Sequence, residues 1–237
     1  MKIGFIGFGA VAKRLAAILD DFTTVTISTG RSEKTLKNIR DSNVETVESF
    51  EDADIIFSAT SPKESLNNAR KYGKDFKGVY VDLNNISPET SLKIDEMVPN
   101  YVDAAIIGHI NNDFILFLSG DNSDKLNFLN EYFPVRIISD NIGDASKLKV
   151  LRSIYTKPLS AVLIETLAIA DKCNLREELL ETLAISEGEN FKDSALSRVE
   201  NTLNNSKRKR EELTEILEYF HDEDLTMVRA ALEKISK

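Results

Sequence analysis

Short apolar runs alternate with amphipathic stretches along the first 139 residues, and this alternation restricts the folds that the chain can adopt. Runs rich in β-branched and aromatic residues predict strands at 2–6, 24–28, 54–59, 78–83, 101–107, 114–120 and 135–139. Helical patterns lie between them at 11–21, 32–41, 62–73 and 87–98. Strands that alternate with helices predict a doubly wound α/β domain with a mostly parallel sheet covered on both faces.

The pattern changes after Gly143. From Asp144 onward the only residues of the two helix-breaking types are Pro158 and Gly188, and apolar residues recur every three or four positions. That periodicity predicts helices throughout. We therefore expect an α/β domain at 1–141 and an all-α domain at 142–237.

Composition narrows the cellular setting and the partners. The formal net charge of −9 argues against a nucleic-acid-binding protein. The basic run at 207–210 is followed by Glu211 and Glu212 at helical i,i+4 spacing, which indicates a solvated helix face. The chain has one cysteine, and no apolar run approaches the ~18 residues of a membrane helix. We expect a cytoplasmic protein with no membrane or nucleic-acid partner.

The segment GFGAVA at 7–12 has the form G-x-G-x-x-A and lies between a predicted strand and a predicted helix. In a βαβ unit, Gly7 makes the tight turn, Gly9 lets the backbone approach a pyrophosphate, and Ala12 allows close helix packing. The first helical turn then supplies amides and a positive dipole to the anion. The other cofactor-binding candidates of this loop are Phe8, Ala10 and Val11. The alternative is a tight turn without a ligand.

The end of the second predicted strand indicates which dinucleotide is bound. An acid there would bind the ribose 2′-hydroxyl of NAD, whereas an arginine would accommodate the 2′-phosphate of NADP. The strand ends without an acid, and Arg31 and Ser32 follow it. The only acid nearby is Glu33, one position into the next helix. The sequence therefore favours NADP, and the alternative is a surface arginine beside a serine cap.

Two further strands end in polar residues where such sheets place their ligands. Thr60 and Pro62 follow one strand, and Asn84 and Asn85 follow the next. Paired asparagines can donate hydrogen bonds to a carboxamide or a substrate oxygen. The alternative is a polar loop in which Ser87 caps a helix.

A polar stripe opens the helical half. Lys149, Ser153 and Lys157 fall at i, i+4 and i+8, as a domain-interface active site requires. We expect Pro158 to kink this helix. The residues expected on its apolar face are Leu148, Leu151, Ile154 or Tyr155, Leu159 and Val162. The alternative is a row of solvated lysines.

These motifs, in this order, resemble those of the 6-phosphogluconate dehydrogenase-like superfamily, which includes the β-hydroxyacid dehydrogenases. Within it the chain is most similar to archaeal members with a helical C-terminal domain. The resemblance implies a Rossmann domain whose cofactor motif is 7–12. The superfamily's NADP-marking segment corresponds to 30–32, with Gly30 in place of its asparagine. The stretch that lines the nicotinamide site corresponds to 82–88, with Asn84 and Asn85 in place of Ser and Thr.

The same resemblance assigns the substrate site. The superfamily's substrate loop corresponds to 103–109, where Ile107 replaces Ser, Gly108 is retained and His109 replaces the last Gly. The catalytic lysine corresponds to Lys149, and Ser153 stands where the superfamily has Asn. The implied catalytic residues are Lys149, Asn85 and Ser153. The implied substrate-binding residues are Ile107, Gly108, His109 and Lys157.

The resemblance implies an NADP-dependent oxidoreductase that transfers a hydride between nicotinamide and a small hydroxy acid or related alcohol. Lys149 acts in it as general base in oxidation and general acid in reduction. Members commonly pair through the helical domain, so a homodimer is expected. Two alternatives remain open: hydride exchange between NADP and a deazaflavin such as coenzyme F420, or a non-catalytic NADP-binding sensor or scaffold.

Overall fold

The computed structural model describes residues 1–236, and the chain divides into two compact units. The first is Met1–Lys149 and the second begins at Val150. The division falls inside one long helix, α5 (Asp144–Cys173). The boundary predicted at residues 141 and 142 lies just before that helix.

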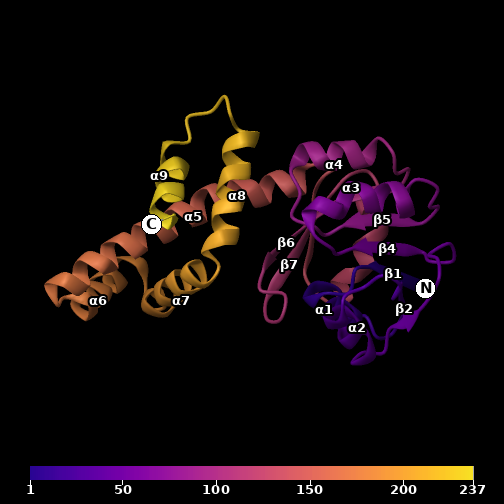
Figure 1. Ribbon diagram of the computed structural model, residues 1–237, viewed down its shortest axis with the longest axis horizontal. Helices are drawn as coiled ribbons and strands as arrows, with labels where there is room; N and C mark the ends of the chain where they lie inside the picture. Colours follow the sequence, from indigo (N-terminus) through magenta and orange to yellow (C-terminus); the bar gives the residue numbers. More distant parts are fainter. Residues whose placement is uncertain (237) are drawn as a thin grey trace. The chain divides into compact units, whose positions relative to one another are not determined.

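An eight-stranded sheet forms the centre of the first unit, in the order β3-β2-β1-β4-β5-β6-β7-β8 (Figure 1). β1 to β6 run parallel, while β7 is antiparallel to β6 and parallel to β8. The mostly parallel, doubly wound architecture is therefore confirmed. The strands are β1 (Lys2–Ile6), β2 (Thr23–Thr26), β3 (Glu45–Thr46), β4 (Ile55–Ser58), β5 (Val79–Asp82), β6 (Tyr101–Gly108), β7 (Phe114–Ser119) and β8 (Val135–Ser139).

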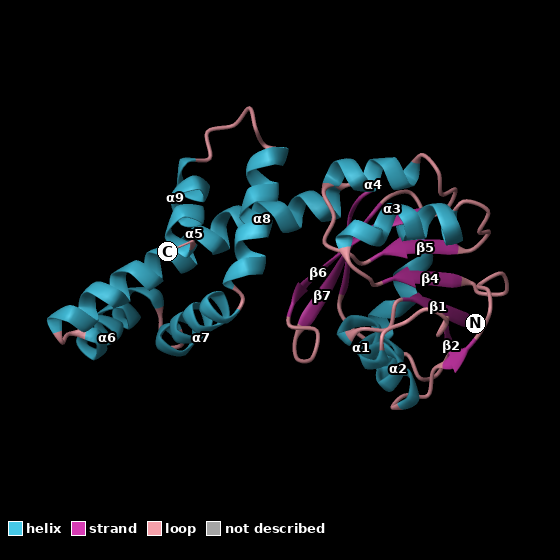
Figure 2. Ribbon diagram, in the orientation of Figure 1, coloured by secondary structure: helices cyan, strands magenta, loops and turns pink. Residues whose placement is uncertain are grey.

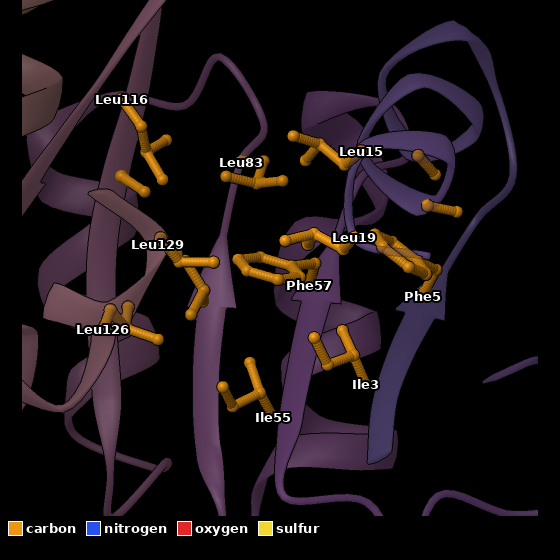
Figure 3. Packing of buried hydrophobic residues seen from close by; sticks show 14 of the residues in the cluster. Ile3, Phe5, Leu15, Leu19, Ile55, Phe57, Leu83, Leu116, Leu126 and Leu129 are labelled. Atoms are coloured by element: carbon orange, nitrogen blue, oxygen red, sulfur yellow. The ribbon is translucent and has the colours of Figure 1, made fainter. Parts of the chain in front are cut away.

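Helices cover both faces of this sheet. One face packs against α1 (Ala10–Ile18), α2 (Glu33–Arg40) and the 3₁₀ segment η3 (Ser123–Glu131). The other packs against α4 (Pro88–Asp95) and a composite helix made of η1 (Pro62–Glu64), α3 (Ser65–Asn68) and η2 (Ala69–Gly73). Phe5 and Phe57, from adjacent strands, stack at 5.7 Å between ring centroids in the first of these layers (Figure 3). Burial of this apolar surface is the main force that holds the helices on the sheet.

Local signals explain where the covering helices begin. The Ser32 and Ser87 side chains accept hydrogen bonds from the Thr35 and Thr90 amides, as expected of N-cap serines. Pro88 occupies the first helical position of α4, where its missing N–H costs nothing.

All seven predicted strands are present. β3 was not predicted, because two residues are too few to show a strand pattern.

The second unit is helical over its described residues (Figure 2). It contains the remainder of α5 with α6 (Arg176–Glu187), α7 (Phe191–Asn204), α8 (Ser206–Tyr219) and α9 (Thr226–Ile235). Its core forms two apolar clusters, one of α5, α8 and α9 around Leu213 and one of α5, α6 and α7 around Leu180. Within residues 1–236, no helix combines the length and apolar character needed to span a membrane.

The expected apolar face of α5 requires a correction. Leu151, Tyr155 and Val162 are 54%, 69% and 57% exposed, so they do not pack in the core. The buried face of the helix passes instead through Ala161, Leu163 and Leu167. The apolar spacing was read correctly, but α5 carries apolar residues on two sides and only one of them faces the core.

Candidate active site

The carboxyl ends of β1 and β4 meet at the centre of the sheet. Strand order reverses there, since the chain goes from β1 outward to β2 and β3 and then returns to β4 on the other side of β1. Ligands of open α/β sheets bind in the crevice outside such a reversal. The β1–α1 loop and the β4–η1 loop, which contain the candidate residues at 7–11 and Thr60 and Pro62, both start at this point.

The two glycines of the β1–α1 loop meet different surroundings. Gly7 has φ +82°, and a Cβ there would lie 2.6 Å from both the Ala59 carbonyl oxygen and the Thr60 methyl group. Only glycine fits such a position without strain. Gly9 is exposed, and a Cβ there would meet no atom of the protein within 4 Å. Gly9 therefore leaves free space above the backbone, which is the room that a cofactor needs.

The N-terminus of α1 completes this cradle. Gly9 is the N-cap and provides no side-chain hydrogen bond, and the first turn has no acidic residue. The leading amides and the helix dipole thus favour an anion. Phe8 is buried and its carbonyl oxygen accepts a hydrogen bond from Asn38 Nδ2 at 3.1 Å, so its side chain supports the loop from below. Ala10 is exposed and Val11 is half-buried at the start of the helix.

The structure places Arg31 and Ser32 after the end of β2. Arg31 Nε donates to the Ile27 carbonyl oxygen at 3.1 Å, which holds the guanidinium across the strand end. The Ser32 hydroxyl is engaged as the N-cap of α2. Glu33, the one acid close by in sequence, forms a 3.5 Å ion pair with Arg40 on the same helix. The cation therefore lies beside the strand end and the acid is directed along α2.

A buried hydrogen-bond network joins the loops that follow β4 and β5. The Thr60 amide donates to Asn84 Oδ1 at 2.7 Å, and Asn84 Nδ2 donates to both Ser58 Oγ and Asp82 Oδ2 at 3.0 Å. The Asn84 amide donates to Asp82 Oδ1 at 2.8 Å. Asn84 was predicted to contact the cofactor, but its side chain is almost fully buried and bonded within the protein. Its observed contacts hold the two loops together.

Asp82 is the titratable group at the centre of this network. It is fully buried, and this desolvation raises the pKa of its carboxyl to about 7; hydrogen bonds from Asn84 oppose the shift, while the Asp103 charge adds to it. Asn85 lies one residue after Asn84, at the tip of a tight turn closed by a 3.0 Å bond from the Ile86 amide to the Asn84 carbonyl oxygen. That turn exposes the Asn85 side chain at the sheet edge, where a ligand can reach it.

The start of α5 is anchored to β6 by a second buried carboxylate. Asp103, which pairs with Asp82 across β5 and β6, accepts hydrogen bonds from the Ser146 amide at 2.9 Å and the Ser146 hydroxyl at 2.6 Å. Ser119 donates to the same carboxylate and accepts from the Ala145 amide. These contacts fix the first turn of α5, and Lys149 follows one turn later on the same helix. Lys149 is half-buried.

The predicted substrate loop forms the hairpin between β6 and β7. Gly108 ends β6, and the exposed His109 begins a turn in which its amide bonds to the Asp113 carbonyl oxygen at 3.0 Å. Ile107 lines a 530 Å³ cavity beside Arg14 and Ile18 of α1. Among residues 1–236 no three side chains of His, Cys, Asp or Glu gather as a metal site would require.

Two further candidates belong to the helical unit. Ser153 is half-buried on α5, one turn after Lys149. Lys157 is buried and forms an ion pair with Glu212 at 3.1 Å. Burial lowers the pKa of Lys157, and Glu212 opposes that shift.

A family model and a relative of known sequence both match this chain. Residues 2–85 match a family model described as NADP oxidoreductase coenzyme F420-dependent. An uncharacterized 28.5 kDa protein from the 7S RNA 5′ region of Methanothermus fervidus is 42% identical over 233 residues, which are 95% of this chain and 93% of that protein.

Solved structures extend the likeness to both units. A conserved protein of unknown function, MTH1747, reported as structurally similar to 3-hydroxyacid dehydrogenases, matches with a TM-score of 0.85 and 35% identity. That match covers 100% of this chain and 96% of the other. The 3-hydroxyisobutyrate dehydrogenase of Mycobacterium tuberculosis, solved with L-serine, has a TM-score of 0.82 at 13% identity over 99% of this chain and 92% of the other, and so shows the shared fold.

The fold and the glycine cradle are those of a nicotinamide-dinucleotide-binding fold. The chain belongs to the 3-hydroxyacid dehydrogenase-like family of NAD(P)-binding Rossmann proteins with a helical C-terminal domain. This places it among oxidoreductases of that NAD(P)-dependent type.

Proposed function

We propose that this protein is an NADP-dependent oxidoreductase that transfers a hydride between nicotinamide and a small hydroxy acid or related alcohol. The observation that carries the proposal is that three features of the candidate site belong to one edge of the sheet. A glycine cradle with free space above Gly9 lies beside the end of β2, which carries Arg31, and α5 is fixed to the same sheet through Asp103.

The choice of NADP rests on the residues that follow β2. A planar guanidinium can bind a phosphate through two parallel hydrogen bonds, and the Nε contact to Ile27 leaves the two terminal nitrogens of Arg31 to do so. An acid at this point would repel the 2′-phosphate. Glu33 is paired with Arg40 and does not occupy the position of an NAD-selecting acid.

Cofactor binding, proton transfer and substrate binding are assigned to different residues of the chain. The bound nicotinamide supplies the hydride acceptor or donor. The amides at the start of α1 bind the pyrophosphate, and Thr60 and Pro62 border the cofactor beside β4. Lys149 transfers the proton of the substrate hydroxyl through its Nζ, which requires a neutral amine at one stage. Asn85 and Ser153 hold the substrate, with Ile107, Gly108 and His109 beside it.

One observation favours a second function. The family model that matches residues 2–85 is described as coenzyme F420-dependent, so a deazaflavin could be the hydride partner. That match covers residues 2–85 alone and leaves Lys149 and the helical unit without a role. We therefore keep hydride exchange between NADP and a deazaflavin as the alternative.

A turnover screen separates these functions. The purified protein is mixed with NADPH or NADP and, in separate reactions, with hydroxy acids, keto acids and a deazaflavin, while absorbance of the reduced nicotinamide is followed. Turnover that depends on an acid supports the proposal, and turnover that depends only on deazaflavin replaces it with the alternative. Binding of NADPH without turnover on any compound would make the protein a non-catalytic NADP-binding sensor or scaffold.

A further inference from the structure

A side chain from α2 contacts the peptide between Phe8 and Gly9. Asn38 Nδ2 donates to the Phe8 carbonyl oxygen at 3.1 Å, across 30 positions of sequence. A carbonyl oxygen only accepts, so Asn38 must present its nitrogen to it. Asn38 is half-buried, and its neighbours Leu36 and Ile39 pack in the apolar layer that also contains Phe8. The donor therefore belongs to an element that is fixed to the sheet.

The loop itself does not fix the plane of this peptide. The plane turns about two bonds, Cα–C of Phe8 and N–Cα of Gly9. Glycine admits a wide range of φ, and a Cβ at Gly9 would meet no atom within 4 Å. The Phe8 ring is anchored, since it is 1% exposed and lies 6.1 Å from the Phe5 ring between centroids. The hydrogen bond from Asn38 therefore restrains a plane that would otherwise be free to turn.

The orientation of this plane decides where the Gly9 amide points. Within residues 1–236 every peptide bond is trans. In a planar trans peptide the C=O and the following N–H point in opposite directions. Because the Phe8 oxygen faces α2, the Gly9 N–H faces away from α2, and it donates to no group of the protein in that range. A turned plane would present the Phe8 oxygen there instead, and that oxygen repels an anion.

We propose that Asn38 is a positioning residue for the cofactor, and that its hydrogen bond directs the Gly9 amide at the pyrophosphate. This amide belongs to the N-cap of α1, where the helix dipole also favours an anion. A donor that is already oriented binds more tightly, because binding does not have to order it. The inference rests on the cofactor part of the proposed function and not on its substrate.

The first test replaces Asn38 by leucine, which has a similar shape and no donor. Calorimetry measures the NADPH and NADH affinities of the full chain without any substrate. Because the two cofactors share the pyrophosphate, Asn38→Leu should weaken both by about tenfold and leave their ratio unchanged. Asn43→Leu is the matched control, since Asn43 is exposed between the end of α2 and the start of β3. It should bind both cofactors as the wild type does.

A displaced α2 would give a different result, because Arg31 lies just before this helix and would move with it. Adenosine 2′-phosphate lacks the pyrophosphate and contains the group assigned to Arg31. Its affinity should be equal in the wild type and in Asn38→Leu. Weaker binding of adenosine 2′-phosphate by the variant, or a changed ratio of the NADPH and NADH affinities, would indicate a structural role for Asn38 and overturn the proposal.

Nuclear magnetic resonance observes the Gly9 amide directly. Labelling with ¹⁵N-glycine gives amide signals for the 10 glycines of the chain, and the signal that is missing in Gly9→Ala identifies Gly9. Saturation with NADP should move the Gly9 amide proton downfield in the wild type and by much less in Asn38→Leu. An equal displacement in the two proteins would contradict the role of Asn38.

The outcomes separate this inference from the proposed function. A wild type that binds neither NADPH nor NADH would refute both. Equal NADPH affinity in the wild type and Asn38→Leu would overturn the role of Asn38 and leave the proposed function standing. The expected loss of affinity in a protein that turns over no hydroxy acid would support the role of Asn38 and refute the proposed reaction.

Discussion

At the scale of single residues, the two glycines of the β1–α1 loop have separate tasks. Gly7 satisfies a constraint inside the protein, because its positive φ and its close approach to Ala59 admit no side chain. Gly9 has no such constraint, since its φ is −82° and the space around it is open. The fold therefore does not require the open space at Gly9, and we propose that the cofactor occupies it.

This difference gives a paired prediction. Gly7→Ala should lower the free energy of unfolding by about 2 kcal/mol or more, from backbone strain and steric overlap. Gly9→Ala should leave it unchanged or slightly higher, because alanine is less flexible in the unfolded chain. NADPH affinity should nevertheless fall at least about tenfold in Gly9→Ala. Denaturant titration and calorimetry measure both quantities. Equal affinity in Gly9→Ala and the wild type would show that no cofactor backbone passes there.

We propose that Arg31 decides between the two nicotinamide cofactors. Arg31→Ala removes the guanidinium beside the end of β2, so the preference for NADPH over NADH should collapse while NADH affinity stays nearly constant. The expected loss of NADPH affinity is about tenfold to a hundredfold, as for a charge-assisted hydrogen bond. Calorimetric titration with both cofactors measures it. An unchanged preference would refute the NADP assignment.

At the scale of elements, a buried carboxylate joins the loops after β4 and β5. Asp82 bonds to Asn84, and Asn84 bonds to the Thr60 amide and to Ser58. The two loops that border the cofactor cradle are thereby held in one arrangement. The cost is a carboxyl group kept away from water, with a pKa of about 7.

That pKa predicts a pH dependence. The folded pKa of Asp82 lies above its ordinary value of 3.8, so its contribution to stability is complete below about pH 4 and is lost as the pH rises to about 7. Within that window the slope for this group is about 1.4 kcal/mol per pH unit. The free energy of unfolding of the wild type minus that of Asp82→Asn should therefore fall between pH 4 and 7. A difference that rises or stays level would contradict the assignment.

Much of this element-level organisation is visible in the sequence. β-branched runs, N-cap serines and the proline at the start of α4 are local signals, and the structure confirms each of them. The anchoring of α5 was not predictable. Asp103 and Ser146 are 43 positions apart, and no spacing rule connects a strand aspartate with a serine in a later helix. Likewise, the hydrogen bonds of Asn84 to Ser58 and Thr60 were not predictable, because those residues follow a different strand. Its role in cofactor binding stays a prediction.

At the scale of the whole molecule, α5 carries an apolar stripe that residues 1–236 leave exposed. Leu151, Tyr155, Val162 and Ile169 recur at a spacing that returns to one face of the helix, and each is more than half exposed. An apolar row of this length is typical of an interface. We propose that it pairs with the same stripe of a second chain.

Light scattering tests the proposed pairing of two chains through this stripe. The wild type should have the mass of two chains at micromolar concentration, and Val162→Asp should shift it toward one chain by placing a charge in the interface. Met227→Glu is the control, because Met227 is an exposed apolar residue of α9 outside the stripe. A wild-type monomer at working concentration would end the proposal.

We propose that hydride transfer in this protein uses Lys149 as general acid and base. The most direct measurement compares kcat and the NADPH dissociation constant of the wild type with those of Lys149→Ala, on whichever substrate the screen identifies. Lys147→Ala is the control, since Lys147 is exposed on the same turn and pairs with Asp144 at 3.0 Å. We expect Lys149→Ala to lower kcat by about 10²–10⁴-fold with NADPH affinity nearly unchanged, and Lys147→Ala to leave both quantities nearly unchanged. Full turnover by Lys149→Ala would contradict it.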